Sequence, residues 1–367
     1  MRFNEALDCL HTYEAGKPIE SVVAQYGIAA KDVIKLASNE NPNGAAPAVV
    51  ARVAQALDKM NMYPDDSMSA LKSALSRHFD VAFEQLIVGS GSDQIIELAV
   101  HAKCQKGDCV LMAGVTFAMY EIYAKAVQAT IVRTQSAEHN LAEFLELYRA
   151  HSPAIIFLCT PNNPLGECLR AADVRAFLRA IDSQTLVVID GAYQEYAAFK
   201  DKDYAIAPKD LIAEFPNVLY LGTFSKVYGL GGMRVGYGIA QAPIIAALHK
   251  LRPPFNVTTL SLLAAEEALA QQEFVQDCLQ QCAREMVRYE RFCEEMGIAF
   301  IRSFANFITL KLEGKDSTKL AQWLMERGII VRNLASYHLN AIRITIGTES
   351  QNTRLLERLR EFWSLEH

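Results

Sequence analysis

Short apolar runs alternate with longer amphipathic stretches along most of this chain. From about residue 70 onward, the apolar runs read as strands, at 86–88, 109–112, 130–132, 154–159, 186–189, 218–221 and 235–239. Stretches with helical periodicity lie between them, at 92–102, 141–151 and 171–181. This alternation predicts an α/β fold whose mostly parallel sheet is covered by helices on both faces.

The pattern changes near residue 255. A long helical stretch is expected at about 259–295, and the last hundred residues read as a smaller α+β unit. Its predicted elements are strands at 300–301, 306–312, 329–332 and 342–346 and a helix at 318–327. We therefore expect an N-terminal arm over 1–35 that packs on the smaller domain, a large domain over 36–255 and a small C-terminal domain over 256–367.

Composition narrows the functional classes. The 367 residues are 51% hydrophobic and 21% charged, which is typical of a globular protein with a sizeable core. The formal net charge of −6 argues against a general nucleic-acid binder. The longest uncharged run, 150–166, contains three prolines, and a membrane-spanning helix needs about 20 mainly apolar residues. We expect no membrane segment.

The cysteines and histidines form no metal-binding pattern. The eight cysteines include no Cys-x-x-Cys pair, and the eight histidines are scattered. The first residues do not have the basic and then apolar pattern of a secretory signal. We predict a cytoplasmic protein with reduced thiols and no bound metal.

Candidate chemical groups follow several of the predicted strands, where open α/β sheets bind their ligands. Residues 89–94 (GSGSDQ) could offer backbone N–H groups to an anion, although an ordinary strand-to-helix turn fits equally well. Residues 160–166 (TPNNPLG) form a rigid turn that could present an amide, or could serve as a turn alone. Asp190 ends an apolar strand, and a buried carboxylate needs a cation, a salt bridge or a ligand.

The segment 223–234 (TFSKVYGLGGMR) carries the sharpest signal. It places Lys226 just beyond the strand 218–221, where partial burial and a nearby cation could lower its pKa, as a Schiff-base lysine requires. Arg234 could share an anion with the hydroxyls of Thr223 and Ser225. A lone lysine in a glycine-rich loop is normally solvated, but the other groups at the same edge of the sheet favour a functional lysine.

These residues together resemble a known fingerprint. Asn163-Pro164-x-Gly166, Asp190-x-x-Tyr193, Ser225-Lys226 with Arg234, and Arg343 near the C-terminus are similar to fold-type I aminotransferases, which use pyridoxal 5′-phosphate (PLP). Within that group the chain most resembles the histidinol-phosphate aminotransferase branch. The features similar to that branch are 13–18 (YEAGKP), 36–42 (LASNENP), 63–65 (YPD) and 342–347 (IRITIG).

The resemblance implies roles around the cofactor ring. Lys226 would form the Schiff base with PLP and move the proton during transamination. Asp190 would pair with the pyridine nitrogen, so that the ring can accept electrons. Asn163 and Tyr193 would bind the phenolic oxygen, and Phe117 would stack on the ring.

It also implies anion-binding roles. The cofactor phosphate would be held by the backbone at Gly91, Ser92 and Asp93, by Thr223, Ser225 and Arg234, and by Tyr63 from a second subunit. Arg343 would bind the anionic group of the substrate, because a guanidinium matches a carboxylate or phosphate with two parallel hydrogen bonds. Arg332, Tyr13 and Asn39 are further candidates for substrate contact, although a surface salt bridge for Arg332 and a packing role for Tyr13 are equally compatible.

The expected function is transamination of L-histidinol phosphate with 2-oxoglutarate by a homodimer with shared active sites. An aromatic amino-acid aminotransferase and a threonine-phosphate decarboxylase are the alternatives of similar sequence. A scaffold without activity is disfavoured because Lys226, Asp190 and Asn163 are all present. Departures from the usual pattern include Leu165 in place of threonine and Gly191 in place of glutamate.

Overall fold

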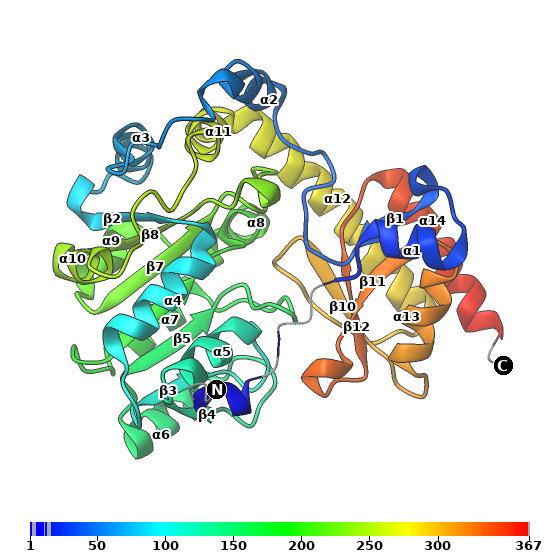
Figure 1. Ribbon diagram of the computed structural model, residues 1–367. Helices are drawn as coiled ribbons and strands as arrows, with labels where there is room; N and C mark the ends of the chain where they lie inside the picture. The colour runs from blue at the N-terminus through cyan, green and yellow to red at the C-terminus, as the bar shows by residue number, and fades with distance from the viewer. Residues whose placement is uncertain (2–4, 11, 13–15, 366–367) are drawn as a thin grey trace.

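The structure is a computed structural model that describes residues 1, 5–10, 12 and 16–365. Two sheets organise the chain, each with helices packed around it (Figure 1). The larger sheet has seven strands in the order β2-β8-β7-β6-β5-β3-β4, and the smaller has five in the order β1-β11-β12-β10-β9.

The seven-stranded sheet contains every strand that the sequence predicts before residue 255. Its strands are β2 (Leu86–Gly89), β3 (Cys109–Met112), β4 (Thr130–Arg133), β5 (Ile155–Cys159), β6 (Leu186–Asp190), β7 (Val218–Thr223) and β8 (Gly236–Ala240). Strand β8 runs antiparallel to its neighbours β2 and β7, and the remaining pairs are parallel. The predicted α/β fold with a mostly parallel sheet is confirmed, and six strands direct their carboxyl ends toward one edge.

The central strands are mostly apolar because both faces of the sheet are covered. All residues of β5, β6 and β7 are buried. Alternate residues of each strand enter different apolar clusters: Val187 and Ile189 lie in one cluster, and Leu186 and Val188 lie in the other. The helices around this sheet are α2 (Pro47–Ala54), α3 (Ser69–Phe79), α4 (Gly91–Lys103), α5 (Ala118–Ala126), α6 (Leu141–His151), α7 (Ala171–Leu178), α8 (Gln194–Lys200), α9 (Pro208–Glu214) and α10 (Ala242–His249).

The smaller sheet combines both ends of the described chain. Its strands are β1 (Ile34–Leu36), β9 (Phe300–Ile301), β10 (Phe307–Lys311), β11 (Ile329–Asn333) and β12 (Ala341–Thr345). Strand β1 pairs in parallel with β11, so the segment around β1 lies against C-terminal elements. The 3₁₀ turn η1 (Glu5–Cys9) instead contacts α5 beside the larger sheet, so this part of the predicted arm does not pack on the smaller domain (Figure 1). Helices α1 (Ile19–Tyr26), α13 (Ser317–Met325) and α14 (Glu349–Leu365) surround this sheet (Figure 1). The domain boundaries themselves stay a prediction.

The long helical stretch is two helices rather than one. Helix α11 (Thr259–Ala270) ends at Gln271, whose ψ of 55° leaves the helical range, and α12 (Gln272–Met296) begins at the next residue. Helix α12 runs from α11 toward the smaller sheet (Figure 1). None of the helices in the described ranges combines the length and the apolar character needed to cross a membrane.

Several 3₁₀ turns complete the chain. They are η1 (Glu5–Cys9), η2 (Ala30–Asp32), η3 (Leu57–Lys59), η4 (Phe83–Gln85), η5 (Lys202–Tyr204), η6 (Gly231–Met233) and η7 (Ala335–Tyr337).

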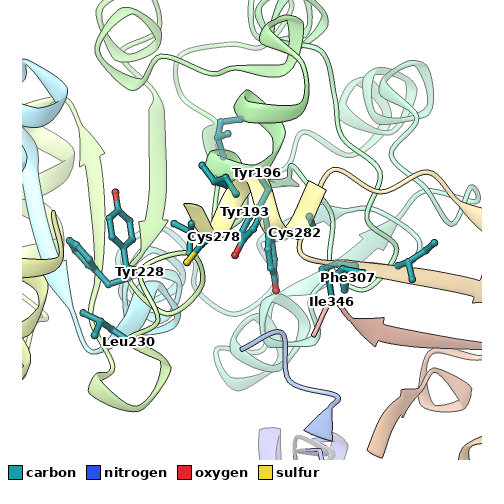
Figure 2. Packing of buried hydrophobic residues seen from close by; sticks show 14 of the residues in the cluster. Tyr193, Tyr196, Tyr228, Leu230, Cys278, Cys282, Phe307 and Ile346 are labelled. Atoms are coloured by element: carbon teal, nitrogen blue, oxygen red, sulfur yellow. The ribbon is translucent and has the colours of Figure 1, made fainter. Parts of the chain in front are cut away.

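One apolar cluster continues from the large sheet into the small one. Figure 2 shows Tyr193 and Tyr196, at the start of α8, beside Cys278 and Cys282 of α12. The ring of Tyr193 meets that of Phe307 on β10 edge to face, with centroids 5.4 Å apart. The two sheets therefore share a packed core next to Tyr193.

Substitution of the buried Phe144 on α6 measures how much the packing around the larger sheet contributes to stability. Its ring is fully buried and meets Phe177 edge to face at 6.1 Å. We expect Phe144→Ala to lower the free energy of unfolding by about 3–5 kcal/mol, because the cavity cannot fully collapse. Urea denaturation measures this loss. Phe199→Ala is the control, since Phe199 is 40% exposed; equal losses in the two variants would contradict the assignment of Phe144 to the core.

Candidate active site

The edge where parallel strands end brings the candidate residues together. Asp190 is the last residue of β6, and Thr223 is the last residue of the adjacent β7. Asn163 lies in the turn after β5, Lys226 follows β7, and Gly91 begins α4 directly after β2. Sequence positions more than a hundred residues apart therefore meet at one edge of the sheet.

A cavity of about 120 Å³ lies at this edge. It is lined by Gly91, Ser92, Asp93, Phe117, Cys159, Asn163, Asp190, Ala192, Tyr193, Thr223, Ser225, Lys226 and Arg234. All of the residues that the resemblance assigned to the cofactor line this cavity, with the exception of Tyr63. The cavity is thus the candidate active site.

The Asp190 carboxylate is held by two neutral donors. The Tyr120 hydroxyl donates to Oδ2 at 2.6 Å, and the Ala192 N–H donates to Oδ1 at 3.1 Å. Burial raises the pKa of Asp190, while the hydrogen bond from Tyr120 opposes that rise. A buried carboxylate with only neutral donors on its oxygens is suited to receive a cationic N–H from a ligand.

Lys226 is prepared to act as a neutral amine. Burial, followed by the positive charges of Arg343 and Arg234, lowers the pKa of Lys226 to about 8. Its Nζ lies 5.5 Å from the centre of the Tyr193 ring. With this pKa, roughly one molecule in ten carries the neutral amine at pH 7 and about half carry it at pH 8, and a nucleophilic amine must be neutral.

One end of the cavity is built for an anion. Arg234 Nη1 donates to Ser225 Oγ at 3.4 Å, and the Ser225 N–H donates to Thr223 Oγ1 at 3.1 Å. The first turn of α4 begins at Gly91, and a helix N-terminus favours negative charge. Gly91 has a φ of 77°, which favours glycine, and a Cβ there would lie 2.6 Å from Arg234 Nη2 and displace the guanidinium.

Asp93 is the acidic residue beside this anion-binding end. Its Oδ2 accepts a hydrogen bond from the Tyr123 hydroxyl at 3.0 Å, and its buried Oδ1 has no hydrogen-bond partner among the described residues. Burial raises the pKa of Asp93. The backbone of Asp93, rather than its carboxylate, therefore fits an anion.

Residues near the smaller sheet connect directly to the cavity. Arg343 on β12 donates through Nη1 to Asn163 Oδ1, and through Nη2 to the Ala37 carbonyl at 2.7 Å. Asn39 Nδ2 donates to Tyr193 Oη at 2.9 Å. Arg343 and Asn39 thus border the cavity through residues that line it, although neither lines it directly.

Three candidate residues lie apart from the cavity or outside the described chain. Tyr63 is 82% exposed and stacks on Phe255, with ring centroids 4.7 Å apart. Arg332 on β11 is paired in register with Arg343 of the neighbouring strand β12 and does not line the cavity. Tyr13 lies outside the described residues.

Comparison with known proteins supplies the family. The sequence matches the family described as aminotransferase class I and II over residues 31–359. The chain belongs to the class I and II aminotransferases. The histidinol-phosphate aminotransferase of Aliarcobacter butzleri is 59% identical over 362 residues, which are 98% of this chain and 99% of the relative. That of Wolinella succinogenes is 57% identical and covers 99% of both chains.

Solved structures agree with this family assignment. The histidinol-phosphate aminotransferase from Sinorhizobium meliloti, in complex with pyridoxal-5′-phosphate, has a TM-score of 0.90 and 27% sequence identity, with coverage of 100% of this chain and 98% of that one. The L-threonine-O-3-phosphate decarboxylase from Porphyromonas gingivalis has a TM-score of 0.77 over 91% of this chain and 100% of that one. At 20% identity, this second likeness concerns the fold alone.

The structure shows how Gly191 and Leu165, two of the departures from the aminotransferase pattern, fit their surroundings. A Cβ on Gly191 would lie 2.5 Å from the Tyr220 hydroxyl and 2.7 Å from its ring carbon Cζ, so Tyr220 fills the space that a side chain at residue 191 would need. Leu165 is buried, so an apolar side chain fits at that position.

Sequence reasoning missed several residues of this aminotransferase site. Cys159 and Ala192 line the cavity, and Tyr120 and Tyr123 bind its two carboxylates. The available signal was spacing: Phe117, Tyr120 and Tyr123 recur every three residues, which places them on one face of a helix.

The low pKa of Lys226 is testable without any ligand. We expect the rate at which Lys226 reacts with an amine-directed reagent to rise with pH with a midpoint near pH 8. An exposed lysine has a pKa of about 10.4. Arg343→Gln removes a nearby positive charge, so the midpoint should move to higher pH. Peptide mass spectrometry across a pH series measures it. Arg179→Gln is the control, because it removes an exposed guanidinium that does not line the cavity. If this control shifts the midpoint as far as Arg343→Gln does, the electrostatic explanation is wrong.

Proposed function

We propose that the chain transfers the amino group of L-histidinol phosphate to 2-oxoglutarate, giving the imidazole-acetol phosphate ketone and L-glutamate. The observation that carries this proposal is the set of relatives named histidinol-phosphate aminotransferase, which are 55–59% identical over nearly the whole chain. The reaction is reversible, so either amino donor can begin it.

PLP is the cofactor that this proposal requires, and the cavity fits it. The phosphate would lie at the Gly91 end, where glycine leaves room beside Arg234 and where Thr223 and Ser225 offer hydroxyls. Asp190 would receive the protonated ring nitrogen, and Lys226 is the amine that would hold the cofactor covalently. When bound, PLP supplies an electron sink for the reacting carbon of the substrate.

The side chains around the cavity divide the remaining work. Lys226 Nζ can release and take up a proton near neutral pH, so it is suited to move the proton of the substrate carbon. Asn39 fixes the Tyr193 hydroxyl, which stays protonated because burial raises the pKa of Tyr193. Asn163 and Tyr193 would then orient the oxygen of the cofactor ring, and Phe117 would cover its face.

Arg343 is suited to both substrates. Histidinol phosphate carries a phosphate monoester and no α-carboxylate, whereas glutamate carries carboxylates, and a guanidinium binds either group with two parallel hydrogen bonds. The Phe307 ring lies 5.1 Å from the guanidinium carbon of Arg343, and the Ala37 carbonyl orients it. Arg332, on the adjacent strand, is a second candidate contact, and a contribution from Tyr13 stays a prediction.

A homodimer is part of the proposal because an apolar surface surrounds Tyr63. Large exposed apolar side chains gather in two segments that we call the Tyr63 patch: Leu57, Met60, Met62, Tyr63, Leu251 and Phe255. The segments are tied together, since Arg252 Nη2 donates to Asp66 Oδ2 at 2.7 Å. Exposed apolar patches mark protein contacts, and a second copy of this chain would cover this one while Tyr63 reaches the partner's cavity.

The half-reaction is the direct test of function. Protein loaded with PLP should change its visible absorption on addition of L-histidinol phosphate alone, with no acceptor present. Lys226→Ala should abolish this change, because no other amine lines the cavity among the described residues. A faster response to L-phenylalanine would replace the proposal with an aromatic aminotransferase. Release of CO₂ from threonine phosphate would replace it with a decarboxylase.

The dimer is tested through the Tyr63 patch. We expect the wild-type chain to sediment as a dimer and the double variant Met60→Lys/Met62→Lys to shift toward monomer, since two charges would be buried at the interface. Val287→Lys, an exposed apolar position on α12 outside the patch, should keep the dimer. A monomeric wild type, or a double variant that dimerises as tightly, would exclude this surface as the interface.

A further inference from the structure

One helix directs an aromatic stripe toward the cavity. Phe117 precedes α5 as its N-cap residue and lines the cavity, and Tyr120 and Tyr123 follow at three-residue intervals. The Tyr120 hydroxyl reaches Asp190, and the Tyr123 hydroxyl reaches Asp93. The same helix face therefore binds both carboxylates of the site.

Two aromatic rings hold the Tyr120 side chain in place. Its side chain has no exposed surface, and its ring stacks on Phe157 of β5 with centroids 4.3 Å apart and planes 5° apart. Phe117 meets the same ring edge to face at 5.6 Å. These two rings fix the direction of the Tyr120 hydroxyl, which points to Asp190 Oδ2 at 2.6 Å.

The direction of this hydrogen bond is defined. Burial, followed by the Asp190 charge, raises the pKa of Tyr120 well above its usual value, so the hydroxyl keeps its proton and acts as donor. A hydrogen bond to the charged form of a carboxyl group favours that form. Tyr120 therefore opposes the tendency of burial to protonate Asp190.

We propose that Tyr120 is a positioning residue, which holds the Asp190 carboxylate ionised and turned toward the ring nitrogen of bound PLP. This inference rests on the proposed function. Tyr120 does not line the cavity among the described residues, so it acts through Asp190 rather than on the cofactor directly. The predicted consequence is specific: removal of the hydroxyl should weaken cofactor binding and slow turnover only as long as Asp190 is present.

Tyr120→Phe isolates the hydroxyl, because it keeps the ring and its stacking on Phe157. We expect the affinity for PLP, measured by absorption titration of the apoprotein, to fall about tenfold, as for loss of one hydrogen bond to a charged group. We expect kcat to fall by a similar factor, while KM for histidinol phosphate changes less than about twofold, because substrate binding does not involve Asp190.

A double-mutant cycle separates positioning from general stability. In an Asp190→Ala background, Tyr120→Phe should change PLP affinity less than about twofold, since its target is gone. Tyr289→Phe is the matched control: it removes a fully buried hydroxyl that donates to Asn352 Oδ1 at 3.0 Å in the C-terminal part of the chain. This control variant should retain wild-type PLP affinity and kcat.

The possible results separate this inference from the proposed function. Equal loss of PLP affinity with and without Asp190, or wild-type affinity and kcat in Tyr120→Phe, would overturn the role of Tyr120 and leave the aminotransferase proposal intact. A wild-type protein that binds no PLP would overturn both. A loss of PLP affinity on Tyr120→Phe that occurs only when Asp190 is present supports the positioning role of Tyr120.

Discussion

Asp190 ends a strand whose five residues are all buried, and in the described part of the chain its carboxylate oxygens accept hydrogen bonds from the neutral Tyr120 hydroxyl and Ala192 N–H. Burying a charge in this way is costly unless hydrogen bonds or a ligand compensate. The surrounding structure supplies two neutral donors, and bound PLP would supply the missing positive charge. The cavity, the neighbouring strands β5 and β7 and the aromatic residues of α5 all surround this one carboxylate.

The same site joins the two sheets. Asn39 accepts a hydrogen bond from the Thr345 hydroxyl of β12 and donates one to Tyr193, while Arg343 of β12 reaches Asn163 in the turn after β5. Movement of the smaller sheet relative to the larger one would disturb all of these contacts together. Substrate recognition by Arg343 and the orientation of the cavity side chains are therefore mechanically linked.

Much of the architecture could be predicted from the sequence, because buried strands such as β5 and β6 are short, apolar and bounded by turn residues. The break between α11 and α12 at Gln271 could not be predicted, because no glycine or proline stands there. Sequence motifs identified Lys226, Asp190 and Arg234, because an amine, a carboxylate and a guanidinium at the ends of strands are typical of a site that binds a cofactor. Tyr120 was missed because its partner is 70 residues away, and no local pattern states which carboxylate a buried hydroxyl will meet.

The Tyr220 hydroxyl fills the space that a side chain at residue 191 would need, and Gly191 leaves that space free. A glutamate at residue 191 of this chain would therefore require a smaller residue at 220 or a different spacing of β6 and β7. The two positions are expected to covary, and the order of change matters. A smaller residue at 220 must come first, because a side chain introduced at 191 beforehand would clash with Tyr220 of β7, at the position that directly follows Asp190.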